Sequence, residues 1–340
     1  MFPWWELFLV CLFAFSLECL GNKRIPVLTS TSFSSQHRHG SFHVECPERI
    51  SVTIEHLESS IYADLSFNSD KDVEIWEKKS KKALKWVKAV HDEEYIDEVA
   101  LACKKGLRVL SPWDSDTYIS RDSFETFLLA QSSWLDCIDM SMTGVQAFSL
   151  SRPPGHHALK SRSCGFCVFN YAVAAAKYAL ETKEGINRVA ILDWDVHFGN
   201  GVSALVANNP NIRYASMHQM DIFPGGISSM ESWNGPAGNL INVGIEAGAG
   251  GEAYVNALSE KILPFLLGES FKPDLLIVCA GYDALDSDPV ANVSLRPGDF
   301  YTMTRLVKER CSRGRSVPIP ICLGLEGGYN LAELPLAVEQ

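Results

Sequence analysis

The second half of the chain alternates short apolar runs with segments of helical periodicity. The apolar runs have the length of strands and cover residues 145–150, 189–192, 212–217, 275–280 and 319–325. Between them, apolar residues recur with a helical period at 171–180, 202–207 and 254–267. Strands that alternate with helices predict a mostly parallel sheet with helices on both faces, and therefore an α/β fold.

The first half is less regular. We expect a strand at 25–30 and helices at 47–59, 92–104 and 124–143. Pro47 opens the first of these helices, where proline is favoured because the first helical N–H groups have no partner within the helix. The charged segment 65–82 is interpreted as surface, and 111–120 as a loop. A last helical segment runs from 334 to the end at 340, which is the pattern of a chain that is cut short.

An apolar run at 7–17, broken only by Ser16, precedes the predicted domain. It has the length of the hydrophobic part of a signal peptide and is too short for a membrane span. The segment before it carries Glu6 and no lysine or arginine, and no small-x-small cleavage site follows. Two interpretations stay open: export or organelle targeting, or a merely hydrophobic extension. We assign residues 1–24 to this extension and 25–340 to one catalytic domain.

Composition and charge narrow the class of protein. With 46% hydrophobic and 21% charged residues, the 340-residue chain is typical of a soluble globular enzyme, and we expect no stable membrane span. A net charge of −11 argues against a broad phosphate-binding surface, so we expect no direct nucleic-acid binding. The ten cysteines have no repeating spacing and are interpreted as reduced and buried, not as a disulfide framework.

Polar side chains follow the predicted strand at 189–192. Asp193, Asp195 and His197 stand at every second position, so in extended backbone they point to the same face. Buried charges need a partner or a metal, and the closest basic residue, Arg188, lies at the other end of the strand. We therefore predict a metal site. The alternative is a cluster of salt bridges at the strand end.

Three more predicted strands end in groups of the same kind. His156 and His157 follow the first, Asp283 follows 275–280, and Tyr329 follows 319–325. Ligands of open α/β sheets bind outside the carboxyl ends of the strands. We therefore expect all these groups to meet in one crevice.

A metal held by Asp195, His197 and Asp283 would keep room for water or substrate, which is typical of a catalytic site. Zn²⁺ fits this ligand set, and Fe²⁺ or Co²⁺ are alternatives because oxygen and imidazole ligands discriminate poorly among them. Such an ion polarises a carbonyl and lowers the pKa of water.

The remaining groups supply proton transfer. His156 and His157 would form an acid–base pair, oriented by Asp193 and Asn200. Because a carboxylate favours imidazolium more than an amide does, the two pKa values should move apart. Tyr329, on a flexible Gly-Gly turn, could hydrogen-bond a developing oxyanion. The set predicts metal-assisted amide hydrolysis.

Taken singly, two of these motifs favour other interpretations. Cys164-Gly-Phe-Cys167 has the spacing of a thioredoxin-type redox motif. Phe166 and Phe223 would by default be core residues. The joint occurrence of the motifs carries the inference.

At these residues the chain resembles the zinc-dependent histone deacetylase family, and within it the class II branch, of which Asn200 is a mark. The matching motifs are Arg152-Pro-Pro-Gly-His-His-Ala158, Cys164-Gly-Phe-Cys167, Asp193-Trp-Asp-Val-His197, Gly199-Asn-Gly201 and Leu325-Glu-Gly-Gly-Tyr-Asn330, within a similarity over roughly 25–335. The resemblance implies a three-layer, arginase-like α/β fold and hydrolysis of acetyl-lysine in histones or other proteins to lysine and acetate.

By matching position, Asp195, His197 and Asp283 become zinc ligands, and the two histidines and Tyr329 keep the roles given above. The resemblance also implies a narrow channel for the lysine stem and a structural potassium ion. The channel residues are Phe166 and Phe223 as walls, Gly165 and Val290 nearby, and Asp116 at the rim. The potassium ion would lie close to Asp193, Asp195, His197, Ser216 and Met217. These roles override the core and redox interpretations.

Three other functions stay open. They are a small-molecule amidohydrolase for acetylated polyamines, a weakly catalytic chromatin scaffold, and a thiol oxidoreductase that uses Cys164 and Cys167. Polyamine-selective members of the family place an acidic residue where Val290 stands, which favours an acetylated protein, with a histone tail as the implied partner. The resemblance implies the nucleus or cytoplasm, whereas the apolar N-terminus suggests an organelle or the secretory route.

Overall fold

The computed structural model describes residues 24–67, 73–225 and 234–340. The predicted extension at 1–24 therefore lies outside the described residues except for its last position, and its separation from the domain stays a prediction. None of the described helices is long and apolar enough to cross a membrane.

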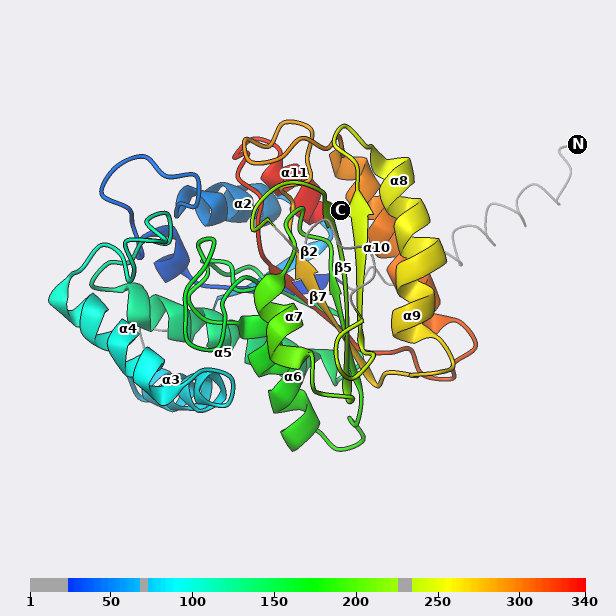
Figure 1. The fold of residues 1–340 in the computed structure, drawn as a ribbon, viewed down its shortest axis with the longest axis horizontal. Coiled ribbons are helices and arrows are strands. Elements are labelled where there is room, and N and C mark those ends of the chain that lie inside the picture. Colours follow the sequence, from blue (N-terminus) through cyan, green and yellow to red (C-terminus); the bar gives the residue numbers. More distant parts are fainter. Residues whose placement is uncertain (1–23, 68–72, 226–233) are drawn as a thin grey trace, which may run out of the picture.

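Eight strands form one sheet at the centre of the molecule (Figure 1). They are β1 (Ile25–Thr29), β2 (Ala63–Phe67), β3 (Ala147–Ser149), β4 (Val189–Asp193), β5 (Ile212–Gln219), β6 (Leu240–Ile245), β7 (Leu275–Ala280) and β8 (Ile321–Leu325). Their order in the sheet is β2-β1-β3-β8-β7-β4-β5-β6, and every pair of neighbours is parallel. The predicted α/β fold is confirmed, and the sheet is wholly parallel among the described strands.

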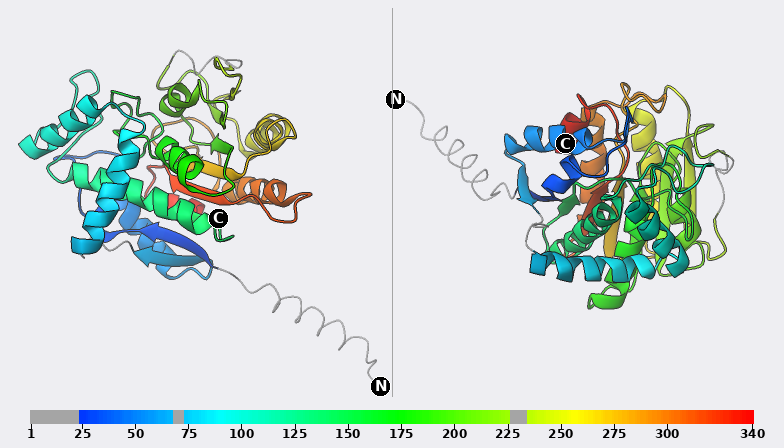
Figure 2. Two further views of the ribbon diagram at one scale, coloured as in Figure 1. Left: turned by 90° about the horizontal axis from the view of Figure 1, so that it is seen from below. Right: turned by 90° about the vertical axis from the view of Figure 1, so that its left-hand side faces the viewer.

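Helices cover both faces of the sheet, which gives three layers (Figures 1 and 2). One face carries α5 (Ser123–Ser141), α6 (Tyr171–Thr182) and α7 (Asn200–Val206), with α3 (Val73–Lys88) packed outside α5 and α6 and α4 (Glu93–Lys105) against α5. The other face carries α2 (Glu48–Glu58), α8 (Gly251–Asn256), η3 (Ala257–Ile262), α9 (Leu263–Leu267), α10 (Pro297–Ser312) and α11 (Leu334–Glu339). A short 3₁₀ helix, η1 (Thr31–Ser34), follows β1.

The apolar runs form the middle of the sheet because both of its faces are covered. Every residue of β4 and of β7 is buried, as expected for parallel strands packed between two helical layers. The predicted boundaries of these strands differ from the observed ones by at most one residue. The helix predicted at 254–267 begins earlier, at Gly251, and its middle part, η3, is a π-helix.

Five elements were not predicted, namely η1, β2, β6, α3 and α10. The interpretation of 65–82 as surface is confirmed, since no side chain that the structure describes there is buried, but the sequence analysis missed that most of α3 lies in this segment. Its apolar stripe includes the buried residues Ala83, Trp86 and Val87, but six lysines between positions 78 and 88 hide the stripe in the sequence. This helix packs on α5 and α6 and so covers part of the core.

The strands that carry the predicted reactive groups lie side by side. β3, β8, β7 and β4 are consecutive in the sheet and run in the same direction. Their carboxyl ends therefore lie at one edge, and the segments that follow them build the site.

Candidate active site

Asp195, His197 and Asp283 converge at the carboxyl edge of the sheet. The first two follow β4, and Asp283 follows the neighbouring strand β7. Nδ1 of His197 lies 3.1 Å from Oδ1 of Asp195 and 2.9 Å from Oδ2 of Asp283. One potential ligand atom from each residue lies within 4.8 Å of the other two. The structure thus brings together the three residues predicted to bind a metal.

The donor atoms of this cluster fit a divalent ion. Both carboxylates are fully buried, and neither contacts a lysine or arginine side chain in the described part of the chain. Two buried carboxylates beside an imidazole need a cation, and oxygen and nitrogen donors of this kind bind Zn²⁺ or Fe²⁺. Gly281 and Gly327 leave the space open, because a Cβ at either position would collide with these carboxylates.

The pKa of His197 shows how strongly the two carboxylates attract positive charge. Burial lowers the pKa of this imidazole, but its hydrogen bonds to Asp195 and Asp283 outweigh burial and raise it to about 10. Either an imidazolium or a metal ion can compensate the negative charge of the two carboxylates at this point. The alternative of a salt-bridge cluster would need a lysine or arginine, which the described residues do not supply at this point.

His156 and His157 follow β3, and each faces a different partner. Nδ1 of His156 lies 3.1 Å from Oδ2 of Asp193, and Nδ1 of His157 lies 2.7 Å from Oδ1 of Asn200. On its other side, Nε2 of His156 lies 3.7 Å from Oδ1 of Asp195. Both side chains are almost fully buried, with ring centres 4.0 Å apart. The two predicted His–partner pairs are therefore present as contacts.

The pKa values of these two histidines are shifted in opposite directions. Burial lowers the pKa of both. In His156 the charges of Asp195 and Asp193 outweigh burial and raise the pKa well above its ordinary value. In His157 positive charge on His156 and His197 adds to burial and lowers the pKa well below its ordinary value. The predicted separation is confirmed, and the positive neighbours of His157 are a second cause of it.

Tyr329 faces the same site from the segment after β8. Its backbone N–H and that of Asn330 donate to Oδ2 of Asp288, at 2.7 and 3.2 Å. The guanidinium of Arg49 lies 4.7 Å from the centre of the Tyr329 ring. Burial raises the pKa of the phenol well above its ordinary value, so the hydroxyl stays protonated and can donate a hydrogen bond.

A pocket of about 240 Å³ opens beside the cluster. It is lined by Asp114, Asp116, His157, Gly165, Phe166, His197, Phe223, Val290 and Tyr329. All five residues predicted to contact substrate are among them, and Asp114 is an addition that the sequence analysis missed, although it stands two positions before Asp116. The default interpretation of Phe166 and Phe223 as core residues is wrong, because both line this pocket and Phe223 is 47% exposed.

A tight hairpin gives the pocket one of its walls. The backbone N–H groups of Cys164 and Cys167 each donate to the other's carbonyl oxygen, at 3.0 and 2.9 Å. Between them, Gly165 and Phe166 have φ values of 53° and 69°, the combination of a type I′ turn. A Cβ on Gly165 would lie 2.6 Å from Cε1 of Phe223. The glycine therefore allows this aromatic side chain to approach the hairpin closely.

The two cysteines of the hairpin do not have the properties of a redox centre. Burial raises the pKa of Cys164 and raises that of Cys167 more strongly. A redox-active cysteine needs a lowered pKa, because the thiolate is the reactive form. The thiol oxidoreductase alternative loses its support.

The residues predicted to surround potassium lie on or after two neighbouring strands. Asp193 on β4 pairs with Ser216 on β5, and Met217 follows Ser216. All three are fully buried. Oγ of Ser216 lies 2.8 Å from Nδ1 of His218. The potassium site stays a prediction.

Three buried polar side chains contact the site without having been assigned a role from the sequence. They are Tyr214, Asp288 and Glu326. Glu326 is part of the last strand-end motif, which was a signal that could have drawn attention to it. The contacts that tie them to the site join residues far apart in the chain, such as Tyr214 with Asp193 and Glu326 with Gly155, so local pattern could not identify them.

Comparison with known proteins gives consistent matches. Residues 43–340 match the sequence model of the histone deacetylase domain. An uncharacterized protein of Synechocystis is 38% identical over 320 residues, which are 92% of this chain and 97% of that protein. The chloroplastic histone deacetylase 14 of Arabidopsis thaliana is 32% identical over 340 residues, covering 95% of this chain and 77% of that protein. The solved HDA15 HD domain matches with a TM-score of 0.76 at 26% identity, covering 93% of this chain and 88% of that one.

Proposed function

The chain belongs to the histone deacetylase family, a family of metal-dependent hydrolases of acetylated amides, and we propose that this member removes the acetyl group from acetyl-lysine in proteins. The observation that carries the proposal is the meeting of three potential metal ligands with two His–partner pairs beside one pocket. A binding module would have no use for buried groups with such opposed pKa values.

We assign Asp195, His197 and Asp283 as ligands of a zinc ion. When bound, this ion would supply Lewis-acid chemistry by polarising the acetyl carbonyl and lowering the pKa of water. Gly327 supports the ligand set, because its N–H donates to Oδ2 of Asp195 at 2.8 Å. The N–H of Val196 does the same for Oδ1 of Asp283 at 3.0 Å. These bonds orient the two carboxylates, and the N–H of His197 adds a third by donating to Oδ1 of Asp195 at 2.9 Å. Oδ2 of Asp283 accepts no backbone bond among the described residues.

We assign the proton acceptor to His157. It lines the pocket, and its lowered pKa keeps Nε2 free to take a proton from the attacking water. His156, with its raised pKa, is cationic and supplies a proton or positive charge to the leaving amine. Asp193 and Asn200 hold the two imidazoles through Nδ1, which fixes the face that each Nε2 presents.

Tyr329 stabilises the negative charge that develops on the acetyl oxygen. Its phenol lines the pocket and stays protonated, so it can donate to that oxygen. The hydrogen bond from the phenol therefore stabilises the transition state more than the bound amide, because the acetyl oxygen carries more negative charge in the transition state. The rings of Phe166 and Phe223 flank the aliphatic stem of the lysine, and Gly165 allows their close approach.

The charge of the pocket bears on the class of substrate. Asp114 and Asp116 line one part of it, whereas Val290 contributes only apolar surface. An acetylated polyamine carries its other positive charges on its own short chain. These charges would lie close to the pocket and would need an acidic partner at the position of Val290. A peptide carries its charges outside the pocket, on neighbouring residues. We therefore favour an acetylated protein, such as a histone tail, over an acetylated polyamine.

The relatives and the N-terminus together support a proposal for the compartment. Two matched relatives are named chloroplastic, and the apolar run at 7–17 precedes the domain in this chain. We infer delivery to an organelle. Imaging the full-length chain with a C-terminal tag tests this, and a signal in the nucleus or cytosol would contradict it.

The decisive experiment is a substrate panel on full-length protein that has been stripped of metal and reloaded with Zn²⁺ or Fe²⁺. Acetate release is measured with an acetyl-lysine peptide and with acetylspermidine. We expect kcat/KM to be higher on the peptide and highest with Zn²⁺. A preference for acetylspermidine would overturn the protein substrate, higher activity with Fe²⁺ would overturn zinc, and no acetate from either substrate would favour a scaffold.

A further inference from the structure

Glu326 buries a carboxylate next to the proposed acid–base pair. It follows β8 directly, and its backbone N–H continues the ladder by donating to the carbonyl oxygen of Ala280 at 3.0 Å. The residue is fully buried. Arg49 approaches only its carbonyl oxygen, at 2.5 Å, and no lysine or arginine among the described residues contacts the carboxylate. Burying a carboxylate costs free energy unless hydrogen-bond donors surround it, so its partners indicate why it is there.

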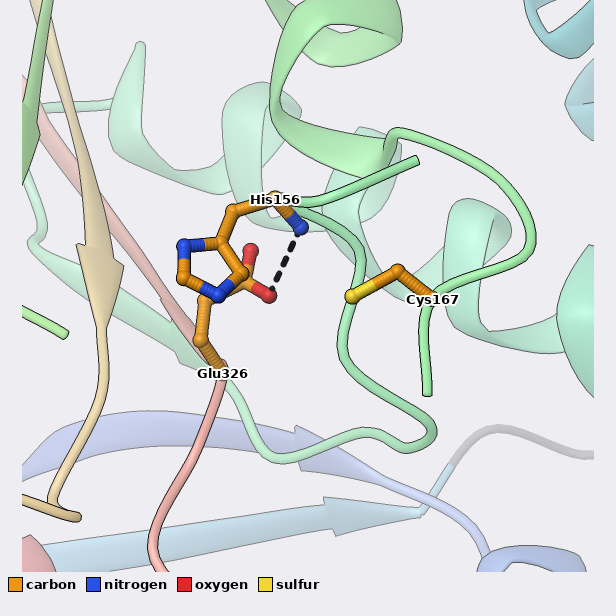
Figure 3. Close-up of side chains that lie close together, drawn as sticks. All are labelled: His156, Cys167 and Glu326. Atoms are coloured by element: carbon orange, nitrogen blue, oxygen red, sulfur yellow. Dashed lines mark hydrogen bonds between the residues drawn. The ribbon is translucent and has the colours of Figure 1, made fainter. Parts of the chain in front are cut away.

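Oε2 of Glu326 has two hydrogen-bond partners, which are consecutive backbone N–H groups, whereas Oε1 has none among the described residues. Oε2 of Glu326 accepts from Gly155 at 2.6 Å and from His156 at 3.1 Å, and the second bond is drawn in Figure 3. Two N–H groups that converge on one carboxyl oxygen form a clamp on the main chain. Gly155 has little freedom to move away, because even a Cβ there would lie 2.8 Å from the carbonyl oxygen of Phe169.

The clamp holds His156 at a second point. Its ring is held by Asp193 through Nδ1, and its main chain by Glu326. In Figure 3 the carboxylate lies beside the imidazole, with the thiol of Cys167 facing both. Both points must be fixed to keep Nε2 of His156 where it is, 3.7 Å from Oδ1 of Asp195. A ring held only through Nδ1 could still shift with its backbone.

We propose that Glu326 is a positioning residue, which fixes the main chain of His156 through two hydrogen bonds and thereby aligns its imidazole for proton transfer. This inference rests on the proposed function of the site. The contrasting explanation is that Glu326 only fills space. If so, an apolar side chain of similar size would serve as well or better, since buried charges are seldom retained for stability alone.

Two variants separate positioning from packing. Glu326→Gln keeps an oxygen that can accept both N–H groups, whereas Glu326→Met keeps the length of the side chain and removes the acceptors. The matched control is Gln131→Met, because Gln131 is a fully buried amide on α5 whose side-chain atoms have no hydrogen-bond partner. It removes a buried polar group of the same size from outside the site.

The first readout is steady-state kinetics of the zinc-loaded protein with zinc content measured on the same samples. We expect Glu326→Gln to keep kcat within about fivefold of the wild type, because its amide oxygen keeps both hydrogen bonds to the main chain. Glu326→Met should lower kcat about 100-fold, because it removes both bonds and lets the reacting imidazole move. KM and zinc content should stay unchanged. In a His156→Ala background, Glu326→Met should cause no further loss. An additive loss, or equal kcat in the Gln and Met variants, would overturn the proposal.

The second readout does not depend on turnover. Amide hydrogen exchange of the segment 153–158 should be slow in the wild type and in Glu326→Gln and fast in Glu326→Met, with Gln131→Met unchanged. Unaltered exchange in Glu326→Met would refute the clamp even in an active enzyme. A clamp in a protein without deacetylase activity would instead refute the proposed function and leave the main-chain role of Glu326 intact.

Discussion

The hydroxyl of Tyr214 donates to Oδ2 of Asp193 at 2.8 Å, and the same oxygen faces Nδ1 of His156 at 3.1 Å. The phenol is fully buried on β5, one strand away from Asp193. It therefore shares with the imidazole the negative charge of one carboxylate oxygen, and it fixes the orientation of that carboxylate.

Tyr214→Phe should weaken catalysis moderately. The change removes the hydrogen bonds of the hydroxyl to Asp193 and to the carbonyl oxygen of Gly199. Neither acceptor is left unpaired, because Oδ2 of Asp193 still faces Nδ1 of His156 and the Gly199 oxygen still accepts the N–H of Ser203. We expect kcat to fall about fivefold and the free energy of unfolding to fall by about 1 kcal/mol. Asp193→Asn is the comparison and should lower kcat more. An unchanged kcat in Tyr214→Phe would show that the hydroxyl does not support Asp193.

Tyr329→Phe should abolish most turnover and leave the metal in place. Phenylalanine keeps the ring and its contact with Phe166, where ring centres are 5.6 Å apart, but it cannot donate a hydrogen bond. Removal of an oxyanion donor lowers kcat by about 100- to 1,000-fold. Metal content measured on the same sample should equal that of the wild type. Normal turnover would contradict the assigned role.

Asp195→Ala should remove the metal. The variant loses one of three ligands and leaves the N–H of Gly327 without its acceptor. We expect metal content after dialysis to fall well below one ion per chain. Asn200→Ala is the control, because Asn200 contacts His157 and not the ion, and it should lose activity with full metal content. Full occupancy in Asp195→Ala would refute this ligand.

Gly165→Ala should block the pocket. A Cβ would lie 2.6 Å from Phe223 and 2.7 Å from His157, and the backbone has φ of 53°, which alanine adopts at a cost of about 1 kcal/mol. Gly144→Ala is a matched control, because Gly144 also has a positive φ, 83°, but open space around its Cβ position. Both variants should lose stability in thermal unfolding, and Gly165→Ala should lose more, because its Cβ also pushes against Phe223 and His157. Only Gly165→Ala should lose kcat/KM, and equal activities would exclude the steric effect.

Acid should destabilise the protein through buried neutral histidines. Burial lowers the pKa of His91 from 6.5 to about 4, and its Nε2 accepts a hydrogen bond from the backbone of Asn170 at 2.9 Å. Between these pH values the unfolded chain binds a proton that the folded chain does not. The free energy of unfolding therefore decreases as pH falls from 6.5 towards 4, by about 1.4 kcal/mol per pH unit for this residue.

Urea unfolding at pH 7.5 and pH 5 measures this effect. We expect the wild type to lose about 2 kcal/mol more than His91→Gln between the two values, since glutamine has no proton to gain. Contributions from all other groups cancel in the difference when both proteins carry the same metal load. Equal losses would show that His91 is not buried in its neutral form.

The site was predictable where its residues are set by local pattern. Asp195 and His197 share a face because they stand two positions apart after a strand, and Asp283 joins them because parallel strands end at one edge. Tyr214, Asp288 and Glu326 could not be assigned in this way. Their roles depend on which distant segment lies opposite, and this follows from the order of the strands in the sheet.

The helices and strands also divide into those that local pattern predicts and those that it does not. The buried strands β4 and β7 were predictable because both faces of each strand are apolar. The helix α3 was not, because lysines surround its buried stripe. The hairpin at Gly165 and Phe166 was equally hidden, since a phenylalanine with positive φ has no signature in sequence.

The place of β8 in the sheet has a consequence for synthesis of the chain. This strand comes last of the eight along the chain, yet it lies between β3 and β7. Until residues 321–325 have left the ribosome, β2-β1-β3 and β7-β4-β5-β6 remain two sheets with unpaired inner edges. Such edges are prone to pair with other chains. A nascent or prematurely terminated product is therefore prone to aggregation. In an N-terminal fragment that ends before β8, the strand that precedes His156 and His157 (β3) and the strand that precedes Asp195 (β4) lie in separate sheets.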